Sequence, residues 1–96
     1  MDSQPRNESI EAFENLINIV AKLRSPTEGC EWHLKQNHIS LLPYLLEEAY
    51  EFSNAMRFEN DENIKEEMGD LLLQILLHAQ IARESNRFDL EEVIKG

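Results

Sequence analysis

The sequence has only one cysteine, Cys30, so the chain cannot form a disulfide with itself. A lone thiol is typical of proteins that fold in a reducing compartment. The first eight residues, 1–8, are polar and lack the apolar segment of a secretory signal. These absences predict a cytoplasmic protein.

Long apolar runs and basic residues are also scarce. The longest apolar run, residues 71–77, is interrupted by Gln74 and is far too short to cross a bilayer. Lys and Arg number 9 against 19 Asp and Glu, a formal net charge of -10, so neither a nucleic-acid polymer nor a membrane is expected as partner. A small polyanion still binds an acidic protein when divalent cations stand between the two, because the cations reverse the local field.

Apolar residues recur at steps of three and four, and no segment alternates as a strand does, so the sequence predicts an all-α fold. We expect one domain, 1–96, with residues 1–8 disordered. Residues 25–37, which include Pro26 and Gly29, are predicted to form a loop. The predicted helices cover roughly residues 9–24, 40–58, 62 to 85 or 86, and 90–96, the last being cut short at Gly96. Their expected caps are Ser40, Asn60 or Asp61, and Asp89.

The helix predicted at 62–86 is apolar around nearly its whole circumference. Such a helix must be covered on several sides, and the other short helices of one chain cover only part of it. We therefore expect a homo-oligomer, either a dimer or a dimer of dimers. The short connection before this helix predicts an antiparallel hairpin. The hairpin and the N-terminal helix would be completed into a four-helix-bundle-like core by dimerisation.

Two acidic pairs stand on the two helices of this hairpin, Glu48 with Glu51 and Glu67 with Asp70. Residues three apart share a helix face, and the hairpin places the two pairs opposite each other. Carboxylate oxygens without a paired Cys or His favour Mg²⁺ or Mn²⁺. The spacing therefore predicts a metal site, although a solvated acidic face explains the same spacing about equally well.

A di-iron carboxylate site is excluded by its own ligand pattern. It requires Glu-x-x-His on paired helices, whereas Glu51 is followed three residues later by Asn54 and Glu67 by Asp70. The ligand set thus favours a redox-inactive hard cation.

The segments LLEEAYE at 45–51 and EEMGDLLLQILLHAQIA at 66–82 closely resemble the MazG nucleotide pyrophosphohydrolase family. The resemblance extends through KLRSPTEGCEWHLKQNHISLLPYLLEE at 22–48 and NRFDLEEVI at 86–94. It covers most of the chain, and these elements in this order make it specific.

The resemblance implies hydrolysis of a nucleoside triphosphate to the monophosphate and pyrophosphate, with Mg²⁺ as cofactor and a role in nucleotide-pool control or housecleaning. It implies that the metal ligands are Glu48, Glu51, Glu67 and Asp70. Glu48 is also expected to position the attacking water as a catalytic residue. Glu47 either fixes the orientation of a ligand or is an exposed helix charge.

Three further residues are weaker candidates for substrate contacts. Lys22 and Arg24 either contact phosphates or interact with the C-terminal dipole of the first helix. Trp32 either stacks on a base or packs beneath the loop, and packing is the favoured interpretation.

The sequence departs from the family pattern in two places. Glu31 and His33 stand where the family usually shows Pro and Asp around the Trp, and the chain ends at Gly96, before a further helix and a basic segment of its relatives. The alternative function is therefore a non-catalytic, acidic dimerisation or regulatory module of the same scaffold. A narrow specificity for dUTP or dCTP stays open, but the loop with Cys30 and Trp32 resembles the broader MazG group. Base and sugar preference are not encoded in these motifs.

Overall fold

A computed structural model describes residues 7–58 and 60–96, and these residues form five helices and no strand. The helices are α1 (Asn7–Leu23), α2 (Glu31–Leu34), α3 (His38–Arg57), α4 (Asp61–Glu84) and α5 (Leu90–Lys95). The predicted all-α class is confirmed. Over the same residues, no helix has the length and apolar character that a bilayer crossing requires.

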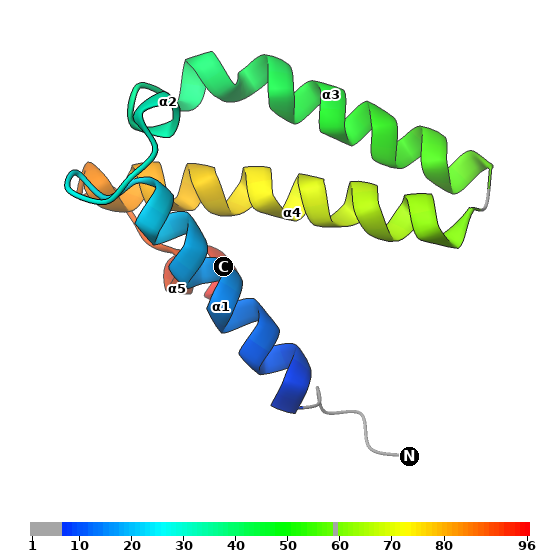
Figure 1. The fold of residues 1–96 in the computed structure, drawn as a ribbon, viewed down its shortest axis with the longest axis horizontal. Coiled ribbons are helices and arrows are strands. Elements are labelled where there is room, and N and C mark those ends of the chain that lie inside the picture. Colours follow the sequence, from blue (N-terminus) through cyan, green and yellow to red (C-terminus); the bar gives the residue numbers. More distant parts are fainter. Residues whose placement is uncertain (1–6, 59) are drawn as a thin grey trace.

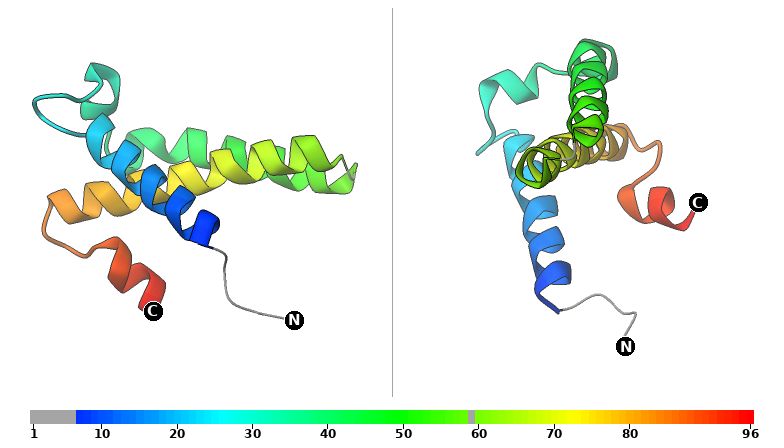
Figure 2. Two further views of the ribbon diagram at one scale, coloured as in Figure 1. Left: turned by 60° about the horizontal axis from the view of Figure 1, so that its bottom comes forward. Right: turned by 90° about the vertical axis from the view of Figure 1, so that its right-hand side faces the viewer.

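The central helix is α4, and α1, α3 and α5 all contact it. Helices α3 and α4 run side by side in opposite directions, as the short connection between them predicts (Figure 1). Helix α1 crosses the C-terminal half of α4 at a steep angle, and α5 folds back beside the same half of α4 (Figure 2). The expected hairpin with an N-terminal helix is therefore present within one chain.

The hydrophobic core lies at the C-terminal half of α4. Its buried members are Val20, Leu41, Leu76, Leu77 and Ile81, with Phe13, Leu16, Leu73 and Leu90 packed against them. The N-terminal half of α4 contributes none of these residues, and the middle of the helix, from Met68 to Ile75, leaves apolar side chains in solvent. Met68, Leu72 and Ile75 are 51%, 37% and 44% exposed.

The helix ends follow local capping chemistry. Asn37, not Ser40, caps α3, because the Asn37 side chain accepts from the Ser40 backbone N–H at 2.8 Å while the Ser40 hydroxyl accepts from the Asn37 N–H at 2.9 Å. Ser40 is thus the second half of a capping box, and α3 begins two residues earlier than predicted. Asn60 and Asp89 cap α4 and α5, as predicted. Of the start predicted to be disordered, Asn7 and Glu8 belong to α1, while residues 1–6 lie outside the described part.

The predicted loop at 25–37 contains the single-turn helix α2 and is anchored by a buried arginine. The Arg24 guanidinium is bidentate to Glu84 at the end of α4, with nitrogen–oxygen distances of 2.7 and 3.0 Å. Its Nη1 also donates to the carbonyls of His33 and Gln36. Gly29 permits the tight path, since a Cβ there would lie 2.6 Å from the Leu23 carbonyl oxygen. The loop is therefore an ordered strap between α1 and α3.

A histidine pair joins the beginning of α3 to α4. Nδ1 of His38 lies 2.7 Å from Nδ1 of His78, and the ring planes differ by 5°. Rings stacked face to face cannot bring atoms so close, so the rings meet edge to edge, one donating an N–H to the other. Burial, and then the neighbouring His38, lowers the pKa of His78, so His78 is neutral near pH 7.

We predict that Arg24→Ala lowers the free energy of unfolding by about 2–4 kcal/mol, because it leaves Glu84 and two carbonyl groups without their partner. Urea denaturation followed by circular dichroism measures the loss. The control is Lys65→Ala, which removes an exposed ion pair with Glu62 and should change stability by less than about 0.5 kcal/mol. Equal losses in the two variants would contradict the anchoring role of Arg24.

Candidate metal centre

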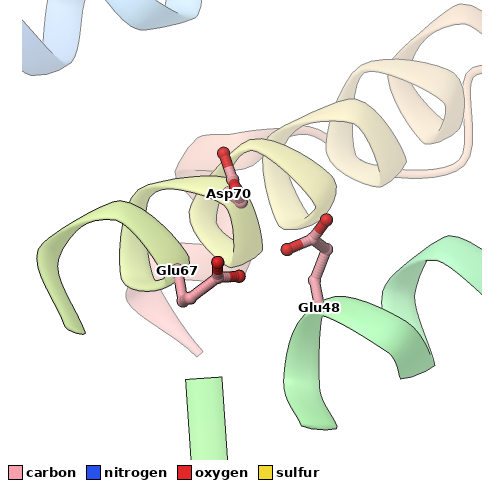
Figure 3. Close-up of side chains that lie close together, drawn as sticks. All are labelled: Glu48, Glu67 and Asp70. Atoms are coloured by element: carbon pink, nitrogen blue, oxygen red, sulfur yellow. The ribbon is translucent and has the colours of Figure 1, made fainter. Parts of the chain in front are cut away.

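Three of the four predicted ligands come together between α3 and α4. Glu48 extends from α3 toward α4, and Glu67 and Asp70 stand one turn apart on α4 (Figure 3). One carboxylate oxygen from each lies within 4.8 Å of the others. Oxygens bound to one Mg²⁺ ion lie up to about 4.2 Å apart, twice the metal–oxygen distance, so a small side-chain rotation brings these three oxygens within reach of one ion. The spread of this cluster therefore fits one cation.

Two oxygens of the cluster are buried without a hydrogen-bond partner, Oε2 of Glu48 and Oε2 of Glu67. Both side chains are half-buried, whereas Asp70 is exposed. Buried carboxylate oxygens without a donor are unfavourable, and a cation would satisfy them. The donors are all hard oxygens, and no Cys or His belongs to the group. The residues present thus fit Mg²⁺ or Mn²⁺ rather than a soft metal.

The carboxylates perturb one another. Burial raises the pKa of Glu48, and the charges of Asp70 and Glu51 raise it further. A hydrogen bond to Glu67 is the main cause that raises the pKa of Glu51, followed by burial. The largest single influence on Glu67 is its contact with Glu51, which lowers the pKa of Glu67. Burial and the charges of Glu48 and Asp70 act in the opposite direction and together outweigh it. The pKa of Glu67 is therefore raised.

Glu51 therefore adjoins the cluster without belonging to its closest group. It contacts Glu67 from the α3 side, whereas the convergent oxygens come from Glu48, Glu67 and Asp70. Glu47 is exposed on α3, and its charge adds to the raised pKa of Glu48 and of Glu51. The structure thus brings together three of the predicted ligands, Glu48, Glu67 and Asp70. The fourth, Glu51, adjoins Glu67, while Glu47 is exposed on α3.

The two cationic candidates lie elsewhere. Lys22 is exposed near the end of α1, beside a small cavity of about 270 Å³ that also includes Glu28 and Cys30. The guanidinium of Arg24 is buried and already bonded to Glu84 and to two carbonyls. A larger cavity, of about 500 Å³, lies between α1, α4 and α5 and shares no residue with the carboxylate cluster.

Trp32 does not pack beneath the loop, so the favoured interpretation of it is wrong. Its side chain is 45% exposed and absent from the core. The ring instead meets Tyr44 edge to face, with centroids 5.6 Å apart. Tyr44 was not among the predicted site residues, although its position four residues before Glu48 places it on the same face of α3.

Comparison with known proteins relates the chain to one family. Residues 36–96 match the MazG nucleotide pyrophosphohydrolase domain, which includes every residue of the carboxylate cluster. The chain is similar to the nucleoside triphosphate pyrophosphohydrolase/pyrophosphatase MazG of Thermotoga maritima, with 58% identity over 83 residues, 86% of the chain and 32% of that relative.

Two further relatives are named nucleoside triphosphate pyrophosphohydrolase. The Escherichia coli K12 protein is 39% identical over 81 residues, 84% of the chain and 31% of the relative. The Mycolicibacterium smegmatis protein is 40% identical over 82 residues, 83% of the chain and 25% of the relative. The chain thus spans about a third or less of the length of these relatives.

We predict that, without metal, the carboxylate cluster lowers stability as pH rises. Glu48, Glu51 and Glu67 have folded-state pKa values raised above 4.5, so the folded protein holds their protons more tightly than the unfolded chain. The stability that these three groups add to the folded protein is complete below pH 4.5. It is lost as the pH rises through their raised folded-state pKa values. Urea denaturation at stepped pH in EDTA measures it.

Two comparisons isolate this effect. Glu48→Gln should make the free energy of unfolding fall less steeply as pH rises. His78 acts in the opposite direction, because its lowered pKa favours the folded state above pH 6.5. This contribution of His78 is the same in the wild type and in the variant. Mg²⁺ should stabilise the wild type more at pH 7.5 than at pH 5. A Mg²⁺ effect that is absent, or equal at the two pH values, would contradict the metal site.

Proposed function

Because the chain belongs to the MazG nucleotide pyrophosphohydrolase family, we propose that it hydrolyses ribo- or deoxyribonucleoside triphosphates to the monophosphate and pyrophosphate, with Mg²⁺ as cofactor and Mn²⁺ as a substitute. The observation that carries this proposal is the convergence of Glu48, Glu67 and Asp70 with two unpartnered buried oxygens. The proposed role is the control of nucleotide pools in the cytoplasm.

In this proposal Glu48, Glu51, Glu67 and Asp70 hold the metal. The bound ion supplies the positive charge that a polyphosphate needs in order to approach a chain of net charge -10. Glu48 also positions the attacking water, since its carboxylate extends from α3 into the cluster where the phosphates would be held (Figure 3). Glu47, on the same helix, restrains the orientation of a ligand carboxylate.

Lys22 is the remaining candidate for a cationic contact to the phosphates, because its ammonium group is exposed. Arg24 is not proposed as a phosphate ligand, since its donors are engaged in the protein. Its proposed contribution is to hold the segment that carries Trp32.

We also propose a homodimer, with dimer pairing as a further step. The observation is the apolar row of Met68, Leu72 and Ile75, which is exposed along the middle of α4. Covering that row with the same row of a second copy would bury apolar surface and complete a bundle of four helices. The row adjoins the turn that carries Glu67 and Asp70, so association would also restrict solvent around the metal ligands.

The alternative is a non-catalytic dimerisation module of the same family. The observation that favours it is Glu31, an acid of the strap that lies apart from the carboxylate cluster. Glu31 forms an exposed ion pair with Lys35 and does not join the carboxylate cluster. A hydrolase and a non-catalytic module of this family differ in whether they turn over nucleoside triphosphates. Measuring pyrophosphate release therefore decides between them.

We predict Mg²⁺-dependent release of pyrophosphate and monophosphate from nucleoside triphosphates, resolved by chromatography, with no release in EDTA. Glu48→Gln should lower kcat at least about a hundredfold. The matched control is Glu66→Gln, which neutralises the exposed acid beside Glu67 and should leave kcat within about twofold. Absence of turnover with every nucleotide tested, in a folded dimer that binds Mg²⁺, would favour the non-catalytic module.

For the dimer, we predict that Leu72→Glu shifts the protein toward the monomer in analytical ultracentrifugation, because it places a charge in the apolar row that the dimer would bury. Leu46→Glu, on the exposed side of α3, is the control and should sediment like the wild type. A wild type that sediments as a monomer at all concentrations would contradict the proposed dimer.

A further inference from the structure

The histidine pair lies in the same helix contact as the carboxylate cluster. Nδ1 of His38, in the first turn of α3, lies 2.7 Å from Nδ1 of His78 on α4, and the ring planes differ by 5°. Apart from contacts among the carboxylates, this is the one hydrogen bond between side chains of α3 and α4 in the described part of the chain. A hydrogen bond is directional, so it forms only at one relative position of the two helices.

The histidine pair and the carboxylate cluster belong to one register of the antiparallel hairpin. Glu48 follows His38 by ten residues along α3, a rise of about 15 Å. On α4, Glu67 and Asp70 precede His78 by eleven and eight residues, rises of about 16 and 12 Å. Because the helices run in opposite directions (Figure 1), the register that pairs the histidines also brings the three carboxylates together.

Apolar packing does not fix this register by itself. Six of the seven residues from 71 to 77 on α4 are apolar. Leu41 of α3 packs in the same core as Leu76 and Leu77, and after a slip of one helical turn it would meet another apolar side chain. Burial of apolar surface has no preferred direction. The same slip would move Glu48 by about 5.4 Å along α4 and separate its carboxylate from the rest of the cluster.

We propose that His38 and His78 are positioning residues, which set the register of α3 on α4 and thereby bring the three carboxylates of the cluster together. This inference rests on the proposed function for the metal site. A polar pair in an apolar contact adds little to the free energy of unfolding, but it selects one arrangement of the helices among several. The pair therefore controls the Mg²⁺ affinity more than the stability of the fold.

The test separates metal affinity from stability. In the full chain, both histidines are replaced by leucine, which removes the hydrogen bond and leaves no ring nitrogen without a partner. Isothermal titration with Mg²⁺ measures the Kd, and urea denaturation in EDTA measures the free energy of unfolding. The double variant His38→Leu/His78→Leu should raise the Mg²⁺ Kd at least about tenfold. Its free energy of unfolding should equal or exceed that of the wild type.

Two further variants should give different patterns. His38→Asn restores Mg²⁺ binding, because the side-chain oxygen of asparagine stands close to the place of Nδ1 and accepts an N–H from His78. Leu77→Ala is the matched control, since it removes a side chain that is 2% exposed from the same contact. It should lower the urea midpoint while the Mg²⁺ Kd stays within about twofold of the wild type. The single variant His38→Leu replaces the double variant if that protein does not fold.

These outcomes distinguish the positioning role from the proposed function. An unchanged Mg²⁺ Kd in the folded double variant overturns the positioning role, and Mg²⁺-dependent pyrophosphate release by the wild type would leave the proposed function standing. Stability and Mg²⁺ affinity that fall together in every variant, including Leu77→Ala, also overturn it, because the pair would then act only as part of the fold.

A hydrolase that fails gives a different result. Weaker Mg²⁺ binding in a stable double variant, with no turnover by the wild type, supports the positioning role and overturns the hydrolase activity. A wild type that does not bind Mg²⁺ overturns the positioning role together with the metal site.

Discussion

Repulsion among four carboxylates at the α3–α4 contact is the constraint on which the rest of the structure depends. Burial raises the pKa of Glu48, its contact with Glu67 raises the pKa of Glu51, and neighbouring negative charges raise both further, so ionising these groups together is unfavourable without a cation. The apolar packing that offsets this repulsion lies at the other end of α4, where α1 and α5 cover it. Helix α4 is thus divided into an acidic part that carries the proposed metal ligands and an apolar part that packs in the core.

The contact between α3 and α4 stays polar beyond the acids. Gln74 and His78 follow Glu67 at helical spacing on the same face of α4, and Gln74 Oε1 and His78 Nε2 are buried without partners. The edge-to-edge bond to His38 satisfies only one side of the His78 ring. Because this face gains little from apolar burial, the hairpin depends on Leu41, Leu77 and the docking of α1 for its stability.

Periodic and local signals were sufficient for the long helices and for the acidic pairs. The bounds of α1, α3 and α4 agree with the predicted ranges to within two residues, and Asn60 and Asp89 cap as expected. The failures have physical causes. Helix α2 has one turn and therefore no period, the capping box of α3 offered two polar candidates, and the partner of Arg24 lies 60 residues away in the chain. Trp32 belongs to the strap that this distant contact holds, so no local pattern predicted its exposure.

The distant contact also links the strap to the helix that carries two of the proposed metal ligands. Helix α4 carries Glu67 and Asp70 near its start and Glu84 at its end, and Glu84 holds the strap through Arg24. The strap sets the position of Trp32, while α3 carries both Tyr44 and Glu48. One helix pair therefore fixes the separation between Tyr44 and the carboxylate cluster. Loosening the Arg24–Glu84 pair would release Trp32 and leave Tyr44 in register with the carboxylates, because only the strap depends on that ion pair.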